Sequence, residues 1–297
     1  MILNMKLVVA VSGGVDSVVL LDMLMKNRLN LHVALSDQTE IIDYTEIVVA
    51  HFDHGMREES ACDARFVREL AKSYGVAFVS KREELAGANE AMARSRRYDF
   101  LFSVKSEQRA NLVTAHHLDD LVETIALNLL RGSRWRGLAT MSNQKIIRPL
   151  TGRTKSELMQ YALENRLEWV EDETNSQDIY KRNKIRKQLA PLPEASKQKI
   201  YGLWLAQNQL RGSIGQEIAK RHFPVFDRYF MIMIDPAVAH ELIYSYMLSE
   251  HNASLLGHQL DLALHAIKVG RPSTKWQIGQ SITMIIDKSK WYVQDKA

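Results

Sequence analysis

The residue types that can do chemistry first gather in a glycine-rich segment at residues 12–17, between an apolar run and an amphipathic stretch. Glycines let the backbone turn tightly and approach a ligand with no side chain in the way. A helix starting there would present unpaired N–H groups and the positive end of its dipole to an anion. The segment therefore predicts a phosphate site. Its residues are Ser12, Gly13, Gly14, Val15, Asp16 and Ser17.

The side chains of this segment indicate which class of phosphate-binding loop it could form. The hydroxyls of Ser12 and Ser17 can add hydrogen-bond donors. No lysine follows the second glycine, so this is not the loop of ATPases that transfer the γ-phosphate. Asp16 is an anion, so it is better suited to holding Mg²⁺ than to bonding phosphate. The alternative is a capped turn between a strand and a helix, which any α/β protein can contain.

A second polar cluster, residues 116–124 (HHLDDLVET), follows another apolar run. If a helix begins near Leu118, Asp120 and Glu123 share one face, while Asp119 and Glu123 are alternatively paired four residues apart. These carboxylates can hold Mg²⁺, bind an ammonium group or accept a proton. Because hard cations prefer such an acid-rich site, zinc is the weaker choice. The alternative is a solvated first turn that complements the helix dipole.

Two basic clusters point to a polyanion. Arginines surround Trp135 in the stretch RGSRWRG, and the indole offers a stacking face to an unpaired base. A second group of lysines and arginines crowds residues 181–187, and such groups neutralise phosphates. A solvated helix face is the alternative for each. The members are Arg131, Arg134, Arg136, Lys181, Arg182, Lys184, Arg186 and Lys187.

The elements that must position these residues alternate between strands and helices. Strands are predicted around residues 7–11, 47–55, 77–83 and 111–117, each followed by a helical pattern, the last ending at Gly132. This alternation is typical of a doubly wound, mainly parallel α/β sheet. The polar segment from Ser36 to Glu46 is expected to be a surface loop.

Beyond residue 149 the pattern becomes mostly helical. Thr154 and Glu157 form a capping box at the start of one predicted helix. Residues 224–297 combine two helical patterns with a hairpin, so we expect a small α+β domain there. The predicted domains are therefore residues 1–193 for catalysis, 194–223 as a helical linker and 224–297 for tRNA or substrate contact.

Composition sets further limits. The chain of 297 residues has a net charge of +4 and a single cysteine, Cys62. One cysteine excludes an internal disulfide, a cysteine zinc site and a two-cysteine sulfur relay. The apolar run at residues 7–11 is too short for a signal peptide or a membrane span, so we expect a cytosolic protein.

Taken together, the motifs resemble those of the tRNA(Ile)-lysidine synthetase family, a branch of the PP-loop ATP pyrophosphatases. The resemblance covers about residues 7–193. It rests on SGGVDS, HFDHGMREES, EAMARSRRYDFL, TAHHLDDLVETIALNLLRG, IIRPLTGRTKSELMQYA and EDETNSQDIYKRNKIRKQLAP.

The resemblance implies that ATP adenylates the wobble cytidine of the isoleucine tRNA with a CAU anticodon. Free lysine would then displace AMP, which changes codon reading from AUG to AUA. Residues 12–17 would bind ATP with His54, His117, Arg94 and Arg97, the two arginines facing the α-phosphate or the tRNA. Asp16 would hold Mg²⁺, and Asp120 and Glu123 would bind or activate lysine. The implied tRNA contacts are Arg131, Trp135, Asp172, Asn175, Arg182, Asn183 and Arg186. A second copy of the chain is a further candidate partner.

This sequence departs from the family pattern in three places. Leu121 stands where the family usually has glutamine, and residues 134–136 (RWR) replace a stretch that is usually small and uncharged. The C-terminal part is expected to hold only the first of two C-terminal domains. Two other functions stay open: a PP-loop tRNA thiolase, which the lone cysteine disfavours, and a nucleotide-binding or RNA-binding module without turnover.

Overall fold

The computed structural model describes residues 3–27, 29, 31–35, 38–55, 60–84, 90–141, 143, 145–171, 181–221, 223–279 and 282–295. It divides into two compact units. The first comprises Met1–Thr124 and Met141–Tyr201, and the second comprises Ile125–Thr140 and Gly202–Ala297. The chain passes between the units within two continuous helices, α4 (Leu118–Leu130) and α8 (Glu194–Lys220).

A mainly parallel sheet forms the centre of the first unit, as predicted. Its strands run in the order β2-β3-β1-β5-β6, and β4 also pairs with β3. Among the described strands of this sheet, β2 and β3 pair in antiparallel fashion and the other pairs are parallel. Their bounds are β1 Leu3–Ala10, β2 Leu31–Leu35, β3 Gln38–Asp53, β4 Ala77–Arg82, β5 Asn111–Val113 and β6 Ile146–Ile147.

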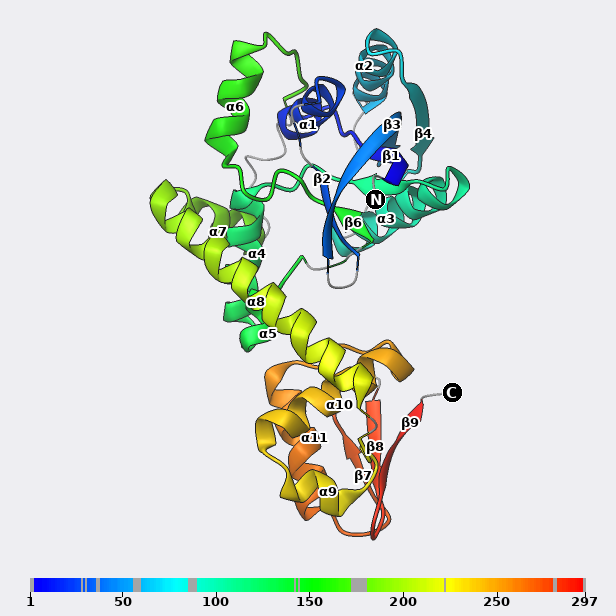
Figure 1. The fold of residues 1–297 in the computed structure, drawn as a ribbon, viewed down its shortest axis with the longest axis vertical. Coiled ribbons are helices and arrows are strands. Elements are labelled where there is room, and N and C mark those ends of the chain that lie inside the picture. The colour runs from blue at the N-terminus through cyan, green and yellow to red at the C-terminus, as the bar shows by residue number, and fades with distance from the viewer. Residues whose placement is uncertain are drawn as a thin grey trace. The chain divides into compact units, whose positions relative to one another are not determined.

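Helices cover both faces of this sheet because successive side chains of a strand point to opposite faces. Leu7 and Val9 of β1 pack in a core with α1 (Val15–Met25), α2 (Ser60–Ser73) and α6 (Lys155–Glu164). Val8 faces the other core, which α3 (Glu90–Glu107) covers (Figure 1). The predicted capping box at Thr154 and Glu157 opens α6.

The expectation of a surface loop at residues 36–46 is wrong for the part that the structure describes. Residues from Gln38 to Glu46 form the first half of β3, and β2 pairs with them from Leu31 to Leu35. The physical reason is that β-branched and aromatic residues such as Ile41, Ile42 and Tyr44 favour a strand despite the polar residues between them.

The second unit has its own core. Its helices α9 (Arg228–Met233), α10 (Pro236–His251) and α11 (Gly257–Val269) pack with a small antiparallel sheet. The sheet contains β7 (Thr274–Gln277), β8 (Ile282–Ile286) and β9 (Trp291–Asp295), so the first arm of the predicted hairpin is divided into two strands. Trp291 is fully buried there, and its indole N–H donates to the carbonyl of Val225 at 2.7 Å. None of the described helices is long and apolar enough to be a membrane span.

Candidate active site

The glycine-rich segment forms a tight loop between β1 and α1. Gly13 has φ of +99°, a conformation that glycine adopts without strain. The Ser17 hydroxyl accepts hydrogen bonds from the backbone nitrogens of Ser12 (3.2 Å) and Gly13 (3.3 Å) and donates to the Gly14 carbonyl (2.8 Å). Ser17 therefore braces the loop, a role that its residue type alone did not reveal.

The N-terminus of α1 is open to an anion. Gly14 is the N-cap residue with extended backbone, and no side chain caps the helix. The buried Val15 begins the helix, and Asp16 lies in its first turn with its side chain 31% exposed. The first N–H groups of a helix have no partner within the helix, so they can receive a phosphate.

The loop and the HHLDD motif meet at the His117 ring. Its nitrogens lie 3.7 Å from an oxygen of Asp16, 3.5 Å from one of Asp119 and 3.4 Å from one of Asp120. Burial by itself lowers the pKa of His117, but these three carboxylates raise it above its ordinary value. The structure thus brings together the predicted residues Asp16, His117 and Asp120 in one site.

Two lysines that sequence patterns did not single out complete this cluster. The Lys155 ammonium lies 2.6 Å from Asp16, and the Lys197 ammonium lies 2.6 Å from Asp119. The backbone N–H of Lys155, at the first position of α6, also donates to Asp119 at 2.7 Å. Burial alone raises the pKa of Asp119, but hydrogen bonds from His117, Lys197 and Lys155 hold it well below its usual range.

Glu123 lies one turn further along α4. Its side chain is only 3% exposed, and Arg186 of α7 (Lys181–Leu189) donates to it through Nε at 3.1 Å. The guanidinium of Arg186 is the counter-ion of this buried carboxylate. One contact therefore joins a predicted lysine-site residue to a predicted tRNA-binding residue.

Histidines and arginines border the loop at the neighbouring strand ends. The buried His51 makes a 2.8 Å hydrogen bond to the Val11 carbonyl, which ties β3 to the residue before the loop. His54 lies just beyond β3, and burial followed by the charge of Arg97 lowers its pKa. Arg94 and Arg97 both lie on α3 beside the Tyr98 ring.

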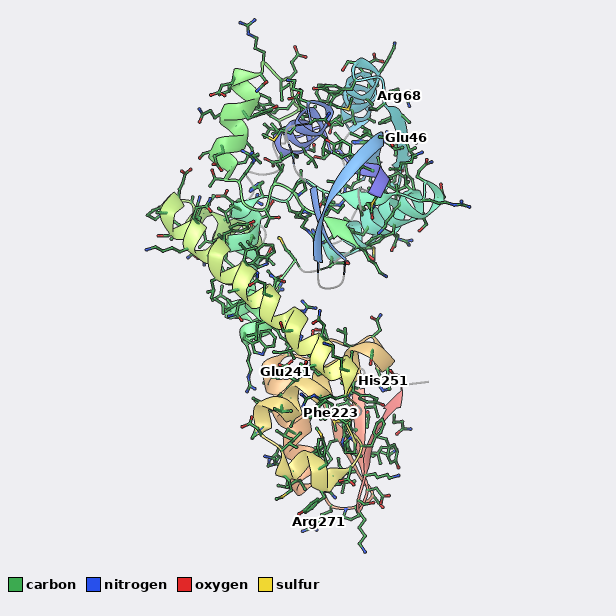
Figure 2. The ribbon with its side chains drawn as sticks, viewed as in Figure 1. Glu46, Arg68, Phe223, Glu241, His251 and Arg271 are labelled. Carbon is green, nitrogen blue, oxygen red and sulfur yellow. The ribbon has the colours of Figure 1, made fainter. Side chains whose placement is uncertain are left out.

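The basic cluster around Trp135 belongs to the second unit and is paired there with acids. The Trp135 indole N–H donates to Glu241 at 3.0 Å, and Arg136 donates to the other oxygen of the same carboxylate. Figure 2 labels Glu241 on α10. Arg134 lies 2.6 Å from Asp261, whereas Arg131 is exposed.

The remaining predicted contacts fall at or beyond the limits of the described chain. Asp172 and Asn175 lie outside the described residues, and so do the side chains of Arg182 and Asn183. Within the described part, no group of three or more His, Cys, Asp or Glu side chains could hold a metal ion.

Comparisons with known proteins show the family of the chain. A family profile described as a PP-loop domain matches residues 3–193. The tRNA(Ile)-lysidine synthase of Enterococcus faecalis is 37% identical over 196 residues, which are 63% of this chain and 40% of that protein. The synthase of Legionella pneumophila is 37% identical over 195 residues, which are 63% of this chain and 42% of that protein. The chain thus spans about two fifths of the length of these relatives.

A solved structure supports the fold. The U34-tRNA thiolase from Methanococcus maripaludis has a TM-score of 0.55 and 18% sequence identity, over 70% of this chain and 72% of the thiolase. At this identity the match concerns the fold alone.

Proposed function

Because the chain belongs to the PP-loop domain family, we propose that it joins lysine to the wobble cytidine of a CAU-anticodon isoleucine tRNA, using ATP. The similarity to tRNA(Ile)-lysidine synthases supports this choice of substrates. The single observation that carries it is the meeting of the α1 N-terminus with Asp16, His117 and Asp120. An anion site and a carboxylate site are what an adenylating ligase with an amine nucleophile needs.

The loop and the start of α1 bind the outer two phosphates of ATP in this scheme. The unpaired N–H groups and the helix dipole stabilise the negative charge, and Lys155 adds a cation beside Asp16. Mg²⁺ held by Asp16 and the phosphates would neutralise charge on the leaving pyrophosphate. The cytidine carbonyl oxygen bonds to the α-phosphorus, and the bond to pyrophosphate breaks.

Asp120 acts in the second step. The lysine ε-ammonium must lose a proton, which costs roughly 4 kcal/mol near neutral pH. Asp120 binds the ammonium and then accepts its proton, so the free amine can attack the activated ring carbon and expel AMP. His116 adds no positive charge there, because burial lowers its pKa to about 3.

Exposed cations on α7 are the proposed tRNA contacts in the first unit. Lys184, Arg186 and Lys187 are all exposed, so phosphates of the RNA can reach them.

Because the reaction needs ATP, tRNA and free lysine together, we place the enzyme in the cytosol. The scheme works for a monomer and for a homodimer alike.

Labelled lysine tests the proposal directly. The protein is incubated with ATP, labelled lysine and an isoleucine tRNA transcript with a CAU anticodon. We expect label in the RNA at the wobble cytidine only, and none in a transcript that carries uridine at that position. Absence of label in the cytidine transcript, from protein that binds both ATP and the RNA, would contradict the proposed function.

A further inference from the structure

Three arginines, two on α3 and one directly after β6, lie near Tyr98 and His116. The guanidinium carbons of Arg94 and Arg97 lie 5.0 and 5.7 Å from the centre of the Tyr98 ring. Arg94 also donates to the Tyr98 hydroxyl at 3.4 Å. Arg148, which follows β6 directly, also lies near this tyrosine. No motif assigned a role to Arg148.

The surroundings of Arg148 leave its charge without a counter-ion. Its Nη1 donates to the carbonyls of Met141 (2.9 Å) and Ile146 (3.4 Å), which fixes the direction of the side chain. Its Nε is buried and has no hydrogen-bond partner among the described residues. No ion pair within the described chain joins Arg94 or Arg148 to a carboxylate. Unpaired charge in a partly buried place is costly, so an anionic ligand is expected there.

The arginines border the phosphate loop. Arg94 and Arg97 lie in the first half of α3, which follows β4, and Arg148 follows β6. Burial is the main cause that lowers the pKa values of His54, after β3, and His116, after β5, and the charges of these arginines lower them further. Strand β1 lies between β3 and β5 in the sheet, and the loop follows β1. The cations therefore lie near the same carboxyl edge as the loop, where ligands of open α/β sheets bind.

We propose that Arg148 binds the α-phosphate of ATP, the phosphate that stays on AMP, beside Arg94, for which the family resemblance already implies a place at this phosphate or at the tRNA. This inference rests on the proposed adenylation. While the cytidine oxygen bonds to the α-phosphorus and pyrophosphate departs with the electron pair of the broken bond, the two guanidinium groups stabilise the charge on the remaining α-phosphate oxygens. Arg148 is only partly exposed, which favours a small phosphate over the RNA backbone, because exposed cations contact the RNA backbone more readily.

Binding measurements separate this subsite from the loop. Calorimetry gives the affinities of AMP and of inorganic pyrophosphate for the unmodified protein and for Arg148→Lys, Arg148→Met and Arg94→Met. Loss of a charge-assisted hydrogen bond should weaken AMP binding about 10- to 100-fold. Pyrophosphate, which occupies the loop, should bind within about twofold of the unmodified protein.

Arg96→Met is the matched control. Arg96 lies on the same helix, but its side chain is 56% exposed and its partner is Glu83 at 3.4 Å. We expect its AMP affinity to be unchanged. A thermal melt of each variant shows whether it is folded. If Arg148→Met does not fold, Arg148→Lys and Arg94→Met carry the test.

Three results would overturn the inference. The first is unchanged AMP affinity in folded Arg148→Lys and Arg94→Met. The second is an equal loss of AMP and pyrophosphate binding. The third is a gel shift showing weaker binding of the tRNA transcript with AMP binding intact, which would assign the cluster to the RNA. Failure of lysine incorporation in unmodified protein whose AMP binding depends on Arg148 would refute only the proposed function.

Discussion

Both units contain clusters of charged side chains, but the clusters differ in how many of their arginines have a carboxylate partner. In the second unit, Arg134 and Arg136 each meet a carboxylate, and the Arg136 guanidinium also lies 4.0 Å from the centre of the Tyr244 ring. In the first unit, Arg94 and Arg148 have no carboxylate partner among the described residues. The α1 N-terminus there has no side-chain cap. The cations without a carboxylate partner and the uncapped helix N-terminus mark the proposed phosphate site, whereas the ion pairs of the second unit stabilise its fold.

The largest expected effect comes from Asp120 in the open cluster. Asp120→Asn removes the proton acceptor, so lysine transfer should fall about 100- to 10,000-fold. ATP–pyrophosphate exchange that depends on tRNA should persist in part, because the loop is unchanged. Glu69→Gln is the control, since Glu69 is 70% exposed on α2. Lost exchange with normal attack on preformed adenylate would show that Asp120 acts in the first step.

Asp22 lies at the centre of a fully paired hydrogen-bond network within the first unit, so it shows what paired charges contribute there. The buried carboxylate of Asp22 accepts hydrogen bonds from Tyr74 (2.6 Å) and Tyr161 (2.7 Å) and pairs with Lys26 at 2.9 Å. We expect Asp22→Asn to lower the free energy of unfolding by about 2–4 kcal/mol. Chemical denaturation measures this, with the exposed Glu46→Gln as control. No loss of stability would contradict a closed, stabilising network.

The same network predicts a pH dependence. Burial alone raises the pKa of Asp22, but hydrogen bonds from Tyr74, Tyr161 and Lys26 lower it below its ordinary value of 3.8. Its stabilisation is therefore complete above the unfolded-state pKa and is lost as the pH falls through the folded-state pKa. The difference in stability between the unmodified protein and Asp22→Asn should shrink below pH 3.8. If this stability difference grew as the pH falls, it would contradict a lowered pKa of Asp22 in the folded state.

A smaller effect is expected at Glu241 in the second unit. Its carboxylate is 16% exposed and pairs with Arg136, which is 18% exposed. Glu241→Gln leaves a partly buried guanidinium without its counter-ion. The free energy of unfolding of the second unit should therefore fall by about 1–3 kcal/mol, as chemical denaturation would measure. Glu217→Gln, in an exposed pair with Arg221, is the control and should be neutral.

The smallest effect is expected at Arg134. Arg134 and Asp261 are 47% and 51% exposed, and exposed ion pairs contribute about 0–1 kcal/mol. Arg134→Ala should therefore change neither stability nor tRNA affinity by much, as denaturation and gel shifts would show. A large loss of tRNA affinity would mean that the Arg134–Asp261 pair opens to contact RNA. It would contradict the conclusion that the paired charges of the second unit serve stability alone.

Local patterns predicted the parallel sheet, the loop and the start of α4, because the residues of each are neighbours in the sequence. Lys155 was missed because its partner Asp16 lies 139 residues away, and Lys197 lies 78 residues from Asp119. Strand β6 has only two residues, too few for a periodic pattern. The acids that neutralise the RWR stretch are more than 100 residues away, so composition alone could not show that its charge is paired.

The fate of ATP tests the central claim most directly. Incubation of the protein with tRNA, lysine and ATP labelled at the α-phosphate should give labelled AMP and free pyrophosphate, because the α1 N-terminus binds the two phosphates that leave together. Production of ADP would mean that the loop serves γ-phosphate transfer, which would contradict adenylation at this site.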